Sequence, residues 1–395
     1  MKRRDAIALG LAAPALASRS AAAACPELRG TGDLLVIVER ARGSLLVAES
    51  TDRTVLGRVE GLGDLSHASL VFSRDARFAF VFGRDGGLSK VDLLERRLVA
   101  RVVQAGNAIG GAISQDGRLV AVANYEPGGV RLFSTEDLAP LGEVAAIGAD
   151  GKRSKVVGLV DTAEGGFAFT LWDSGEIWLL DPSEPASPRI TRFPGIGSLP
   201  YDANVTPDGR FYLAGLFGED GIVLLDLWHP EAGPRRILDG YGRGEAPLPV
   251  YKMPHLEGWG AAGDHLLLPA VGRHEVLVVD ERSWREVARI PTPGQPVFVV
   301  VRPDGREAWV SLAHPDNGKV AILDLERLAP AGTLTPGRAI LHLEFTPRGD
   351  QLWLSARDDD RVIVFDPRRK VELGRLPADK PSGIFSTARA HRIGS

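Results

Sequence analysis

Short apolar runs alternate with short polar breaks along most of the chain. Residues 67–103 show the pattern clearly, with four runs of five to seven residues at 67–72, 78–82, 88–93 and 97–103. Runs of this length that are rich in Val, Phe and Leu and bounded by Asp or Gly are typical of strands joined by tight turns. They are too short for helices. This segment therefore predicts one four-stranded antiparallel sheet.

The polar break between the first and second runs recurs along the chain. It reads SRDAR at Ser73, SQDGR at Ser114, TAEGG at Thr162, TPDGR at Thr206, AAGDH at Ala261, RPDGR at Arg302 and TPRGD at Thr346. The central positions of successive breaks lie 41 to 55 residues apart. A repeat of this length with four strands per unit indicates a β-propeller.

The two ends of the repeat complete each other. Residues 34–59 match the second, third and fourth strands of a unit without a first strand, and residues 381–391 resemble a first strand without successors. We therefore expect the C-terminal strand to pair with the N-terminal blade and close the ring. The prediction is a single all-β domain over residues 34–395, an eight-bladed propeller of four-stranded antiparallel blades, with seven blades as the alternative. Residues 25–33 lead into it.

Composition narrows the function classes without naming one. The chain has 395 residues, of which 44% are hydrophobic and 25% charged, as in ordinary globular proteins. A formal net charge of −4 gives no electrostatic basis for nucleic-acid binding. No apolar run beyond the N-terminal segment reaches the length of a membrane span.

Residues 1–24 have the features of an export signal. Basic residues at 2–4 precede an apolar stretch at 7–17 and three alanines at 22–24. The pattern leaves open whether export uses the twin-arginine or the general route. Cys25, the single cysteine, stands where a bacterial lipoprotein is acylated, but Ala22 replaces the usual large aliphatic residue. A soluble periplasmic protein is favoured over one with a lipid anchor, and intramolecular disulfides and CxxCH haem attachment are excluded.

Candidate chemistry gathers on one face of the predicted ring. Because strands alternate in direction, the links that enter first strands share a face with the links between second and third strands. Three of the eight histidines, His67, His255 and His342, stand at or just before first strands. The long Gly- and Pro-rich segment 239–256 enters a first strand too, and such segments are usually functional. The alternative is that polar residues often end strands beside a wet channel.

His67 has cationic neighbours in the predicted fold. Arg84 lies in the link between the second and third strands of the same blade, and Arg40 and Arg42 occupy the equivalent link of the preceding blade. An imidazole can coordinate iron, while guanidinium groups bind carboxylates with two parallel hydrogen bonds. The set therefore suits an iron-bearing ligand with several carboxylates. For Arg84, ordinary solvation at a hairpin tip is the alternative.

Two stretches carry a family resemblance. HASLVFSRDARFAFVFGRDGGLSKVDL and PSGIFSTARAHRIG resemble the NirF family of periplasmic heme d1 biosynthesis proteins, and the resemblance extends over residues 29–394. The chain is similar, more distantly, to the heme d1 propeller of cytochrome cd1 nitrite reductase and to NirN. The resemblance implies a periplasmic protein of denitrification that binds heme d1 or dihydro-heme d1 and takes part in a late biosynthetic step. A non-catalytic carrier that delivers the cofactor to NirN and the reductase is the alternative, and a homodimer is also implied.

The resemblance implies roles for individual residues. His67 takes the place of the proximal iron ligand, and Arg40 and Arg84 match arginines that bind ring carboxylates. Tyr201 and His255 stand where the reductase has two distal histidines, and would act as proton donor and acceptor. This replacement, and the lack of a c-type haem domain, argue against nitrite reduction. The expected cofactor-binding residues are completed by His342, Ser382 and Gly383. A propeller scaffold that binds no tetrapyrrole remains the third hypothesis.

Overall fold

The structure, a computed structural model, describes residues 30–239 and 258–394. Residues 31–395 form one compact unit, and the fold described below is that of this unit. The expected export signal, Cys25 and the candidate His255 lie outside the described residues. In the described part of the chain, no helix is long and apolar enough to span a membrane.

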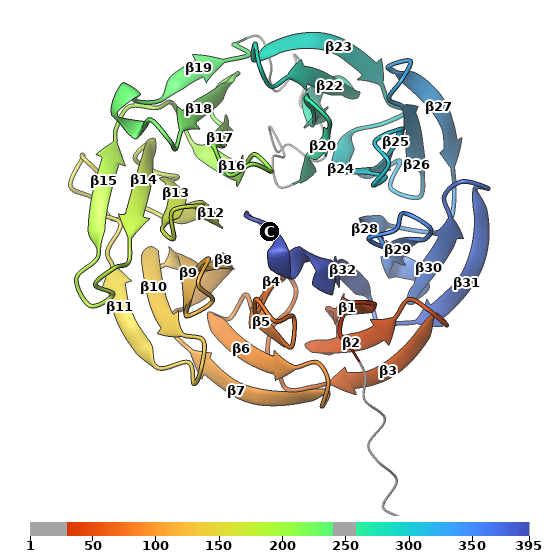
Figure 1. Cartoon of the computed structure of the whole chain (residues 1–395), viewed down its shortest axis with the longest axis horizontal. Coiled ribbons are helices and arrows are strands. Elements are labelled where there is room, and N and C mark those ends of the chain that lie inside the picture. Colours follow the sequence, from red (N-terminus) through yellow and green to blue (C-terminus); the bar gives the residue numbers. More distant parts are fainter. Residues whose placement is uncertain (1–29, 240–257, 395) are drawn as a thin grey trace, which may run out of the picture. The chain divides into compact units, whose positions relative to one another are not determined.

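Eight four-stranded antiparallel sheets form a ring (Figure 1). The strands of each blade run from the innermost outward in the following order. Blade one comprises β32 (Pro381–Ser386), β1 (Leu34–Glu39), β2 (Ser44–Glu49) and β3 (Thr54–Val59). Blade two comprises β4 (Ser69–Phe72), β5 (Phe78–Phe82), β6 (Gly87–Asp92) and β7 (Arg97–Val103). Blade three comprises β8 (Asn107–Ile113), β9 (Leu119–Glu126), β10 (Gly129–Ser134) and β11 (Pro140–Val144).

The remaining blades follow the same order. Blade four comprises β12 (Val156–Asp161), β13 (Phe167–Leu171), β14 (Glu176–Asp181) and β15 (Arg189–Phe193). Blade five comprises β16 (Pro200–Val205), β17 (Phe211–Leu216), β18 (Ile222–Asp226) and β19 (Arg235–Ile237). Blade six comprises β20 (Gly260–Ala262), β21 (His265–Ala270), β22 (Glu275–Asp280) and β23 (Arg285–Pro291). Blade seven comprises β24 (Pro296–Val301), β25 (Glu307–Leu312), β26 (Val320–Asp324) and β27 (Ala329–Leu334). Blade eight comprises β28 (Ile340–Phe345), β29 (Leu352–Ala356), β30 (Arg361–Asp366) and β31 (Val371–Pro377).

The predicted ring closure is confirmed. The C-terminal strand β32 pairs antiparallel with β1, with Leu35 opposite Ser386 and Ile37 opposite Ile384. The first blade therefore takes its innermost strand from the end of the chain, and eight blades rather than seven are formed. The expected final strand is shorter than its apolar pattern suggested. It ends at Ser386, whose side chain caps the 3-10 helix η5 (Thr387–His391) by accepting from the amide of Ala388.

The repeated polar break has a common physical basis. In the first turn of blade two, the Ser73 hydroxyl donates to the Asp75 carboxylate at 2.5 Å and accepts from the amide of Phe78 at 2.9 Å. Ser114 and Thr206 make the equivalent pair of bonds in blades three and five. Such side-chain bonds stabilise a tight turn and hold the start of the following strand. In these blades the motif therefore marks the transition from first to second strand.

The core lies between neighbouring sheets. The second and third strands of each blade are buried on both faces, as in β2 and β6, whereas outermost strands such as β7 are largely exposed. One inter-blade cluster joins Leu35 and Ile37 of blade one to Trp353 of blade eight. Each blade thus needs both neighbours to bury its faces, which favours a closed ring.

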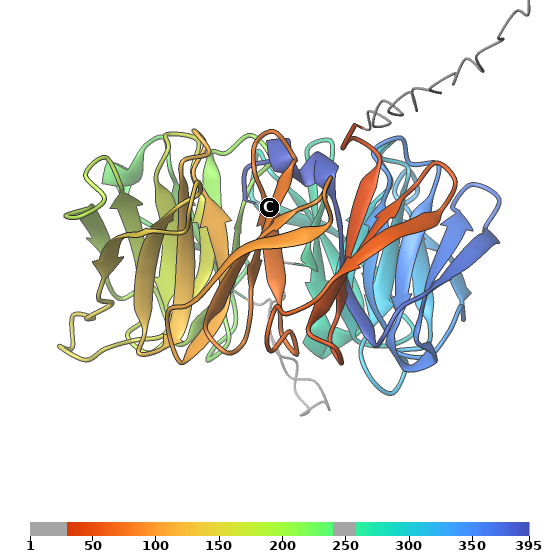
Figure 2. The same ribbon diagram turned by 90° about the horizontal axis from the view of Figure 1, so that it is seen from below.

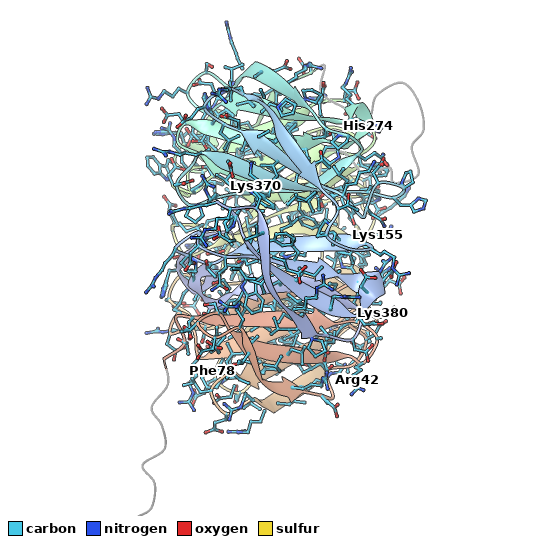
Figure 3. All side chains as sticks on the ribbon, turned by 90° about the vertical axis from the view of Figure 1, so that its right-hand side faces the viewer. Arg42, Phe78, Lys155, His274, Lys370 and Lys380 are labelled. Atoms are coloured by element: carbon cyan, nitrogen blue, oxygen red, sulfur yellow. The ribbon has the colours of Figure 1, made fainter. Side chains whose placement is uncertain are left out.

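The ring has two faces, which differ in the links that they carry. We call the face that carries the links into innermost strands the entry face, and the other the opposite face. Figure 3 shows Arg42, Lys155, His274 and Lys380, all from links of the entry face, along one side of the molecule. Phe78 and Lys370 lie toward the other side. The C-terminal helix η5 lies on the opposite face, over the centre of the ring (Figure 2).

Candidate functional site

Three arginines stand on the entry face in consecutive blades. Arg40 follows β1, Arg84 lies just after β5, and Arg357 begins the 3-10 helix η4 (Arg357–Asp359) that follows β29. Each is partly buried. We call Arg40, Arg84 and Arg357 the arginine cluster. Each is in the link between the second and third strands of its blade, so the propeller repeat itself brings them to one rim.

Electrostatics within the arginine cluster favour an anion. Burial lowers the pKa of Arg40, the positive charge of Arg357 lowers it further, and Asp64 opposes both effects. The pKa of Asp64 is lowered chiefly by hydrogen bonds from Ser66, and then by the charges of Arg84 and Arg40. The carboxylate of Asp64 thus faces two guanidinium groups. The third guanidinium, that of Arg357, is paired with Asp358 at 2.9 Å and 3.2 Å, yet its charge still opposes that of Arg40. A ligand with carboxylates would relieve that repulsion through charge-assisted hydrogen bonds.

Arg42 does not belong to this cluster. Its Nε donates to Asp379 at 2.8 Å, and its Nη1 lies 3.6 Å from Glu60. Both partners are exposed acidic residues beside Arg42, so the structure gives this arginine an ordinary surface ion pair.

His67 stands on the entry face, in the link before β4. The run 67–72 was expected to be strand throughout, but β4 begins at Ser69, and His67 lies in the preceding turn and is exposed. The carbonyl oxygen of Asp64 accepts from the amide of Arg84 at 2.8 Å, which ties this link to the loop of the arginine cluster. The link that carries His67 therefore lies beside the loop that carries Arg84. Iron coordination by His67 stays a prediction.

An aromatic cluster faces the entry side in blades three to five. Trp172 follows β13, Phe217 follows β17 and Tyr201 lies in β16. The centroid of the Trp172 ring is 5.1 Å from that of Tyr201 and 5.4 Å from that of Phe217. The phenol of Tyr125, near the end of β9, lies 3.2 Å from that of Tyr201. We call Tyr125, Trp172, Tyr201 and Phe217 the aromatic cluster. Partly exposed rings of this kind form a surface suited to a flat conjugated ligand.

One position of the repeat accounts for four residues of the two clusters. The residue directly after the second strand is Arg40 in blade one and Arg357 in blade eight, but Trp172 in blade four and Phe217 in blade five. Blades eight, one and two are consecutive around the ring, as are blades three, four and five (Figure 1). The arginine cluster therefore occupies one arc of the rim and the aromatic cluster another. Of these residues only Arg40, Arg84 and Tyr201 were predicted from the sequence. The signal for the residues that were missed lies in the links after the second strands of blades one, four, five and eight. Aligned, these links read RARG, WDSG, FGED and RDDD, and each begins with an arginine or an aromatic residue.

His342 is not a rim residue but part of the wall between blades. Its Nδ1 accepts from the amide of Ile384 at 3.1 Å, and its ring packs against Phe298 and Phe385 with centroids 5.1 Å and 5.4 Å away. Burial, aided by the charge of Arg389, lowers the pKa of His342 to about 4. The imidazole is therefore neutral at pH 7 and carries its proton on Nε2. Any contact it makes with a ligand would be the donation of that proton in a hydrogen bond.

Ser382 and Gly383 lie at the start of β32 and are partly exposed beside the bore. A Cβ atom at Gly383 would lie 2.4 Å from the ring of Phe385, so only glycine lets this ring pack over the strand. The positions fit contacts with a ligand at the mouth, which stays a prediction. A hollow of about 600 Å³, lined by Asp208, Glu281 and Trp284 among others, is on the opposite face between blades five and six, away from both clusters.

Comparisons with known proteins place the chain among heme d1-type propellers. The family described as Cytochrome D1 heme domain matches residues 29–390. Protein NirF of Stutzerimonas stutzeri is 58% identical over 375 residues, which cover 94% of this chain and 96% of the relative. Protein NirF of Pseudomonas aeruginosa is 58% identical over 93% of this chain and 95% of the relative. The chain belongs to the cytochrome d1 heme domain family and, within it, to the NirF proteins.

Two further matches are with a dehydrogenase. The dihydro-heme d1 dehydrogenase of Pseudomonas aeruginosa is 29% identical over 81% of this chain and 64% of the relative. The solved structure of dihydro-heme d1 dehydrogenase NirN in complex with DHE superimposes with a TM-score of 0.79 at 27% identity. That superposition covers 93% of this chain and 78% of the other.

Proposed function

We propose that the protein binds an iron tetrapyrrole, dihydro-heme d1 or a related heme d1 precursor, on its entry face and takes part in a late step of heme d1 biosynthesis. The observation that carries the proposal is the division of the rim into an arginine arc and an aromatic arc. A flat ring with carboxylates at its periphery matches both arcs at once. Membership of the NirF proteins and similarity to a dihydro-heme d1 dehydrogenase support the same ligand class.

The described residues suggest how such a ring would be held. Arg40, Arg84 and Arg357 would bind its carboxylates, each guanidinium offering paired donors. The aromatic cluster would pack against the macrocycle, and His67 would coordinate the iron from the rim. The ligand's own iron would supply redox and coordination chemistry once bound. The protein's part is to orient the ring and neutralise its carboxylates.

Tyr201 is the described candidate for proton transfer. Its phenol lies 3.2 Å from that of Tyr125, so a proton given to a bound ring could be shared along this pair. The second candidate, His255, lies outside the described residues. The carrier hypothesis keeps the same binding site and assigns Tyr201 a packing role only. NirN and cytochrome cd1 nitrite reductase, in the periplasm, are the expected recipients of the ring under either hypothesis.

A visible-spectrum titration tests the binding proposal. Purified protein is titrated with dihydro-heme d1 and with heme d1, alongside His67→Ala and, as a matched control, His229→Ala. His229 is an exposed histidine of the opposite face, 3.4 Å from Glu231. We expect saturable binding with a shifted Soret band that His67→Ala loses and His229→Ala keeps. No saturable change with either tetrapyrrole in the wild type would overturn the proposal and favour the scaffold hypothesis.

Turnover separates enzyme from carrier. If Tyr201 transfers a proton, Tyr201→Phe should bind the ring with nearly wild-type affinity but convert none of it. If the protein only carries the ring, wild type and Tyr201→Phe should release it unchanged, and transfer to a NirN-type acceptor should proceed equally from both.

A further inference from the structure

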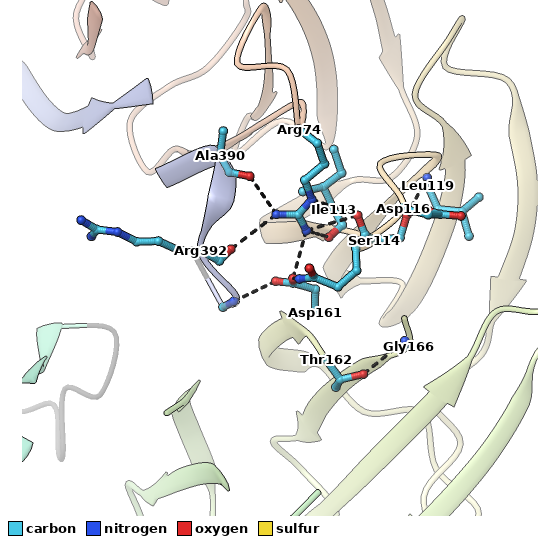
Figure 4. Close-up of polar contacts among 12 residues, drawn as sticks. Arg74, Ile113, Ser114, Asp116, Leu119, Asp161, Thr162, Gly166, Ala390 and Arg392 are labelled. Carbon is cyan, nitrogen blue, oxygen red and sulfur yellow. Dashed lines mark hydrogen bonds and ion pairs between the residues drawn. The ribbon is translucent and has the colours of Figure 1, made fainter. Parts of the chain in front are cut away.

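The C-terminal segment, residues 387–394, crosses the bore of the propeller on the opposite face. It leaves blade one at Ser386, begins with η5, and then contacts blades two, four, five and eight (Figures 1 and 4). Closing the ring requires only β32, which ends before this segment begins. The contacts of residues 387–394 are therefore additional to blade closure and need their own explanation.

Arg74 and Asp161 hold the main chain of this segment from two sides. Nη1 of Arg74, in the first turn of blade two, donates to the carbonyl oxygens of Ala390 at 3.0 Å and Arg392 at 3.4 Å. Its Nη2 donates at 3.1 Å to Asp161, which ends the innermost strand of blade four. The other oxygen of Asp161 accepts from the amide of Gly394 at 2.9 Å (Figure 4). Gln115 also donates to Asp161.

A buried ion pair anchors the start of the segment. Arg389 in η5 binds Glu344 of β28 with two bonds, of 2.9 Å and 2.6 Å, and the side chain of Glu344 is only 6% exposed. Displacement of η5 would carry Arg389 away and leave the Glu344 carboxylate buried without its partner, so the pair disfavours that displacement.

The end of the segment packs against the core of blades four and five. Ile393 packs on the hydrophobic cluster that contains Ala203, Val205 and Tyr212. A Cβ atom at Gly209 would lie 2.9 Å from Ile393, and one at Gly394 would lie 2.4 Å from Val205. Gly209 and Gly394 therefore have no space for a side chain. This indicates that the end of the segment is closely packed against blades four and five.

We propose that residues 387–394 form a plug that seals the bore on the opposite face and leaves the entry face as its single opening. The tetrapyrrole site of the proposed function would then lie at the open end of a bore that is closed at its other end. If that function holds, the ring enters and leaves through the entry face alone. Any protein that supplies or receives it must dock over the arginine and aromatic clusters.

The seal can be tested without a tetrapyrrole. Asn204, near the end of β16, lies beside Gly394, so a thiol placed there is covered by the plug. In a Cys25→Ser background, Asn204→Cys is reacted with a maleimide carrying a polymer too bulky to thread the bore. We expect slow labelling, accelerated at least about tenfold by Arg74→Ala, because each charge-assisted hydrogen bond lost is worth roughly that factor or more.

Arg77→Ala is the matched control. Arg77 stands in the same turn as Arg74, and its Nη2 binds Asp92 at 2.9 Å without touching the C-terminal segment. It should leave the labelling rate unchanged. A second variant, a chain ending at Arg392, removes the contacts of Ile393 and Gly394. Its labelling rate tests the plug independently if Arg74→Ala fails to fold. Rapid labelling in the parent protein, or equal rates in the parent and the truncated chain, would overturn the plug, whatever the outcome of the tetrapyrrole titration.

Discussion

The Nδ1 atom of His342 accepts a hydrogen bond from the amide of Ile384 at 3.1 Å, across the junction between the last blade and the first. Two residues further along each strand, the carboxylate of Glu344 accepts from the amide of Ser386 at 3.1 Å. Side chains of β28 thus satisfy amides of β32 at two matched positions. We call this contact between β28 and β32 the seam. Protonation of His342 or Glu344 would remove the acceptor that each supplies.

Acid should weaken the seam. The pKa of His342 is about 4 in the folded protein and 6.5 in the unfolded chain, so below pH 6.5 the unfolded state binds more protons. The stabilisation is complete above pH 6.5 and is lost as the pH falls, by about 3 kcal/mol at pH 4. The lowered pKa of Glu344, opposed by burial but held down by Arg389, adds a loss in the same direction.

Urea unfolding at pH 7 and at pH 4.5 measures this effect. In His342→Gln, which cannot titrate, the difference between the two midpoints should shrink. In His229→Gln, which alters an exposed histidine, the wild-type difference should persist. An unchanged pH dependence in His342→Gln would show that other groups dominate acid unfolding.

Arg357 is predicted to bind a ring carboxylate. Arg357→Ala should weaken binding of dihydro-heme d1 by about 10- to 100-fold, because a hydrogen bond to a charged group is worth roughly 1.5–3 kcal/mol. Arg357→Lys should recover only part, since an ammonium lacks the paired donors. The control is Arg189→Ala, which removes an exposed arginine bound to Asp181 on an outer strand. Equal affinities for Arg357→Ala and Arg189→Ala would remove Arg357 from the site.

The aromatic cluster should contribute through stacking. Trp172→Ala removes the ring that contacts both Tyr201 and Phe217 and should weaken tetrapyrrole binding by about 5- to 100-fold, as ring stacking is worth roughly 1–3 kcal/mol. Trp228→Ala, at a half-exposed tryptophan of the opposite face, should not change the affinity. Spectral titration measures the tetrapyrrole affinity of both variants. An equal loss of affinity in Trp172→Ala and Trp228→Ala would indicate a general structural effect rather than stacking by Trp172.

Gly111 is predicted to tolerate no side chain. A Cβ atom there would lie 2.4 Å from the carbonyl oxygen of Ala121 and 2.4 Å from the ring of Phe82. Gly111→Ala should therefore destabilise the fold by about 1–3 kcal/mol, through overpacking between blades two and three. Gly374→Ala, on an outer strand with nothing within 4 Å, should be neutral or slightly stabilising. Thermal unfolding of the two variants compares a buried glycine with an open one.

The fold was predictable because its signals are local. In blades two, three and five a Ser or Thr followed two residues later by Asp forms the turn by its own hydrogen bonds, so these first-to-second strand turns could be read from the chain. Ring closure was predictable too, because residues 34–59 lacked a first strand and residues 381–391 resembled one without successors. The 3-10 helix after Ser386 was missed, because its place depends on Arg74, Asp161 and Glu344 from distant blades.

The site was predictable only in part. Arg40 and Arg84 were found through their place in the repeat, whereas Arg357 and Trp172 require the end of each second strand to be known to the residue. His342 was expected at the mouth, but it is the third residue of β28 and turns into the seam with β32. A shift of two residues along a strand moves a side chain about 7 Å deeper into the bore, which no local pattern records.

The pairing of β32 with β1 also fixes an order of events in time. Strands β1 to β3 are made before the other blades, yet their sheet stays incomplete until residues 381–386, which follow the other seven blades in the chain, reach it. A chain that stops before them has seven complete blades and an open edge at β1, a ready partner for another unpaired strand. Until residues 381–386 pair with β1 that edge stays open, and the same residues lead directly into the segment that crosses the bore on the opposite face.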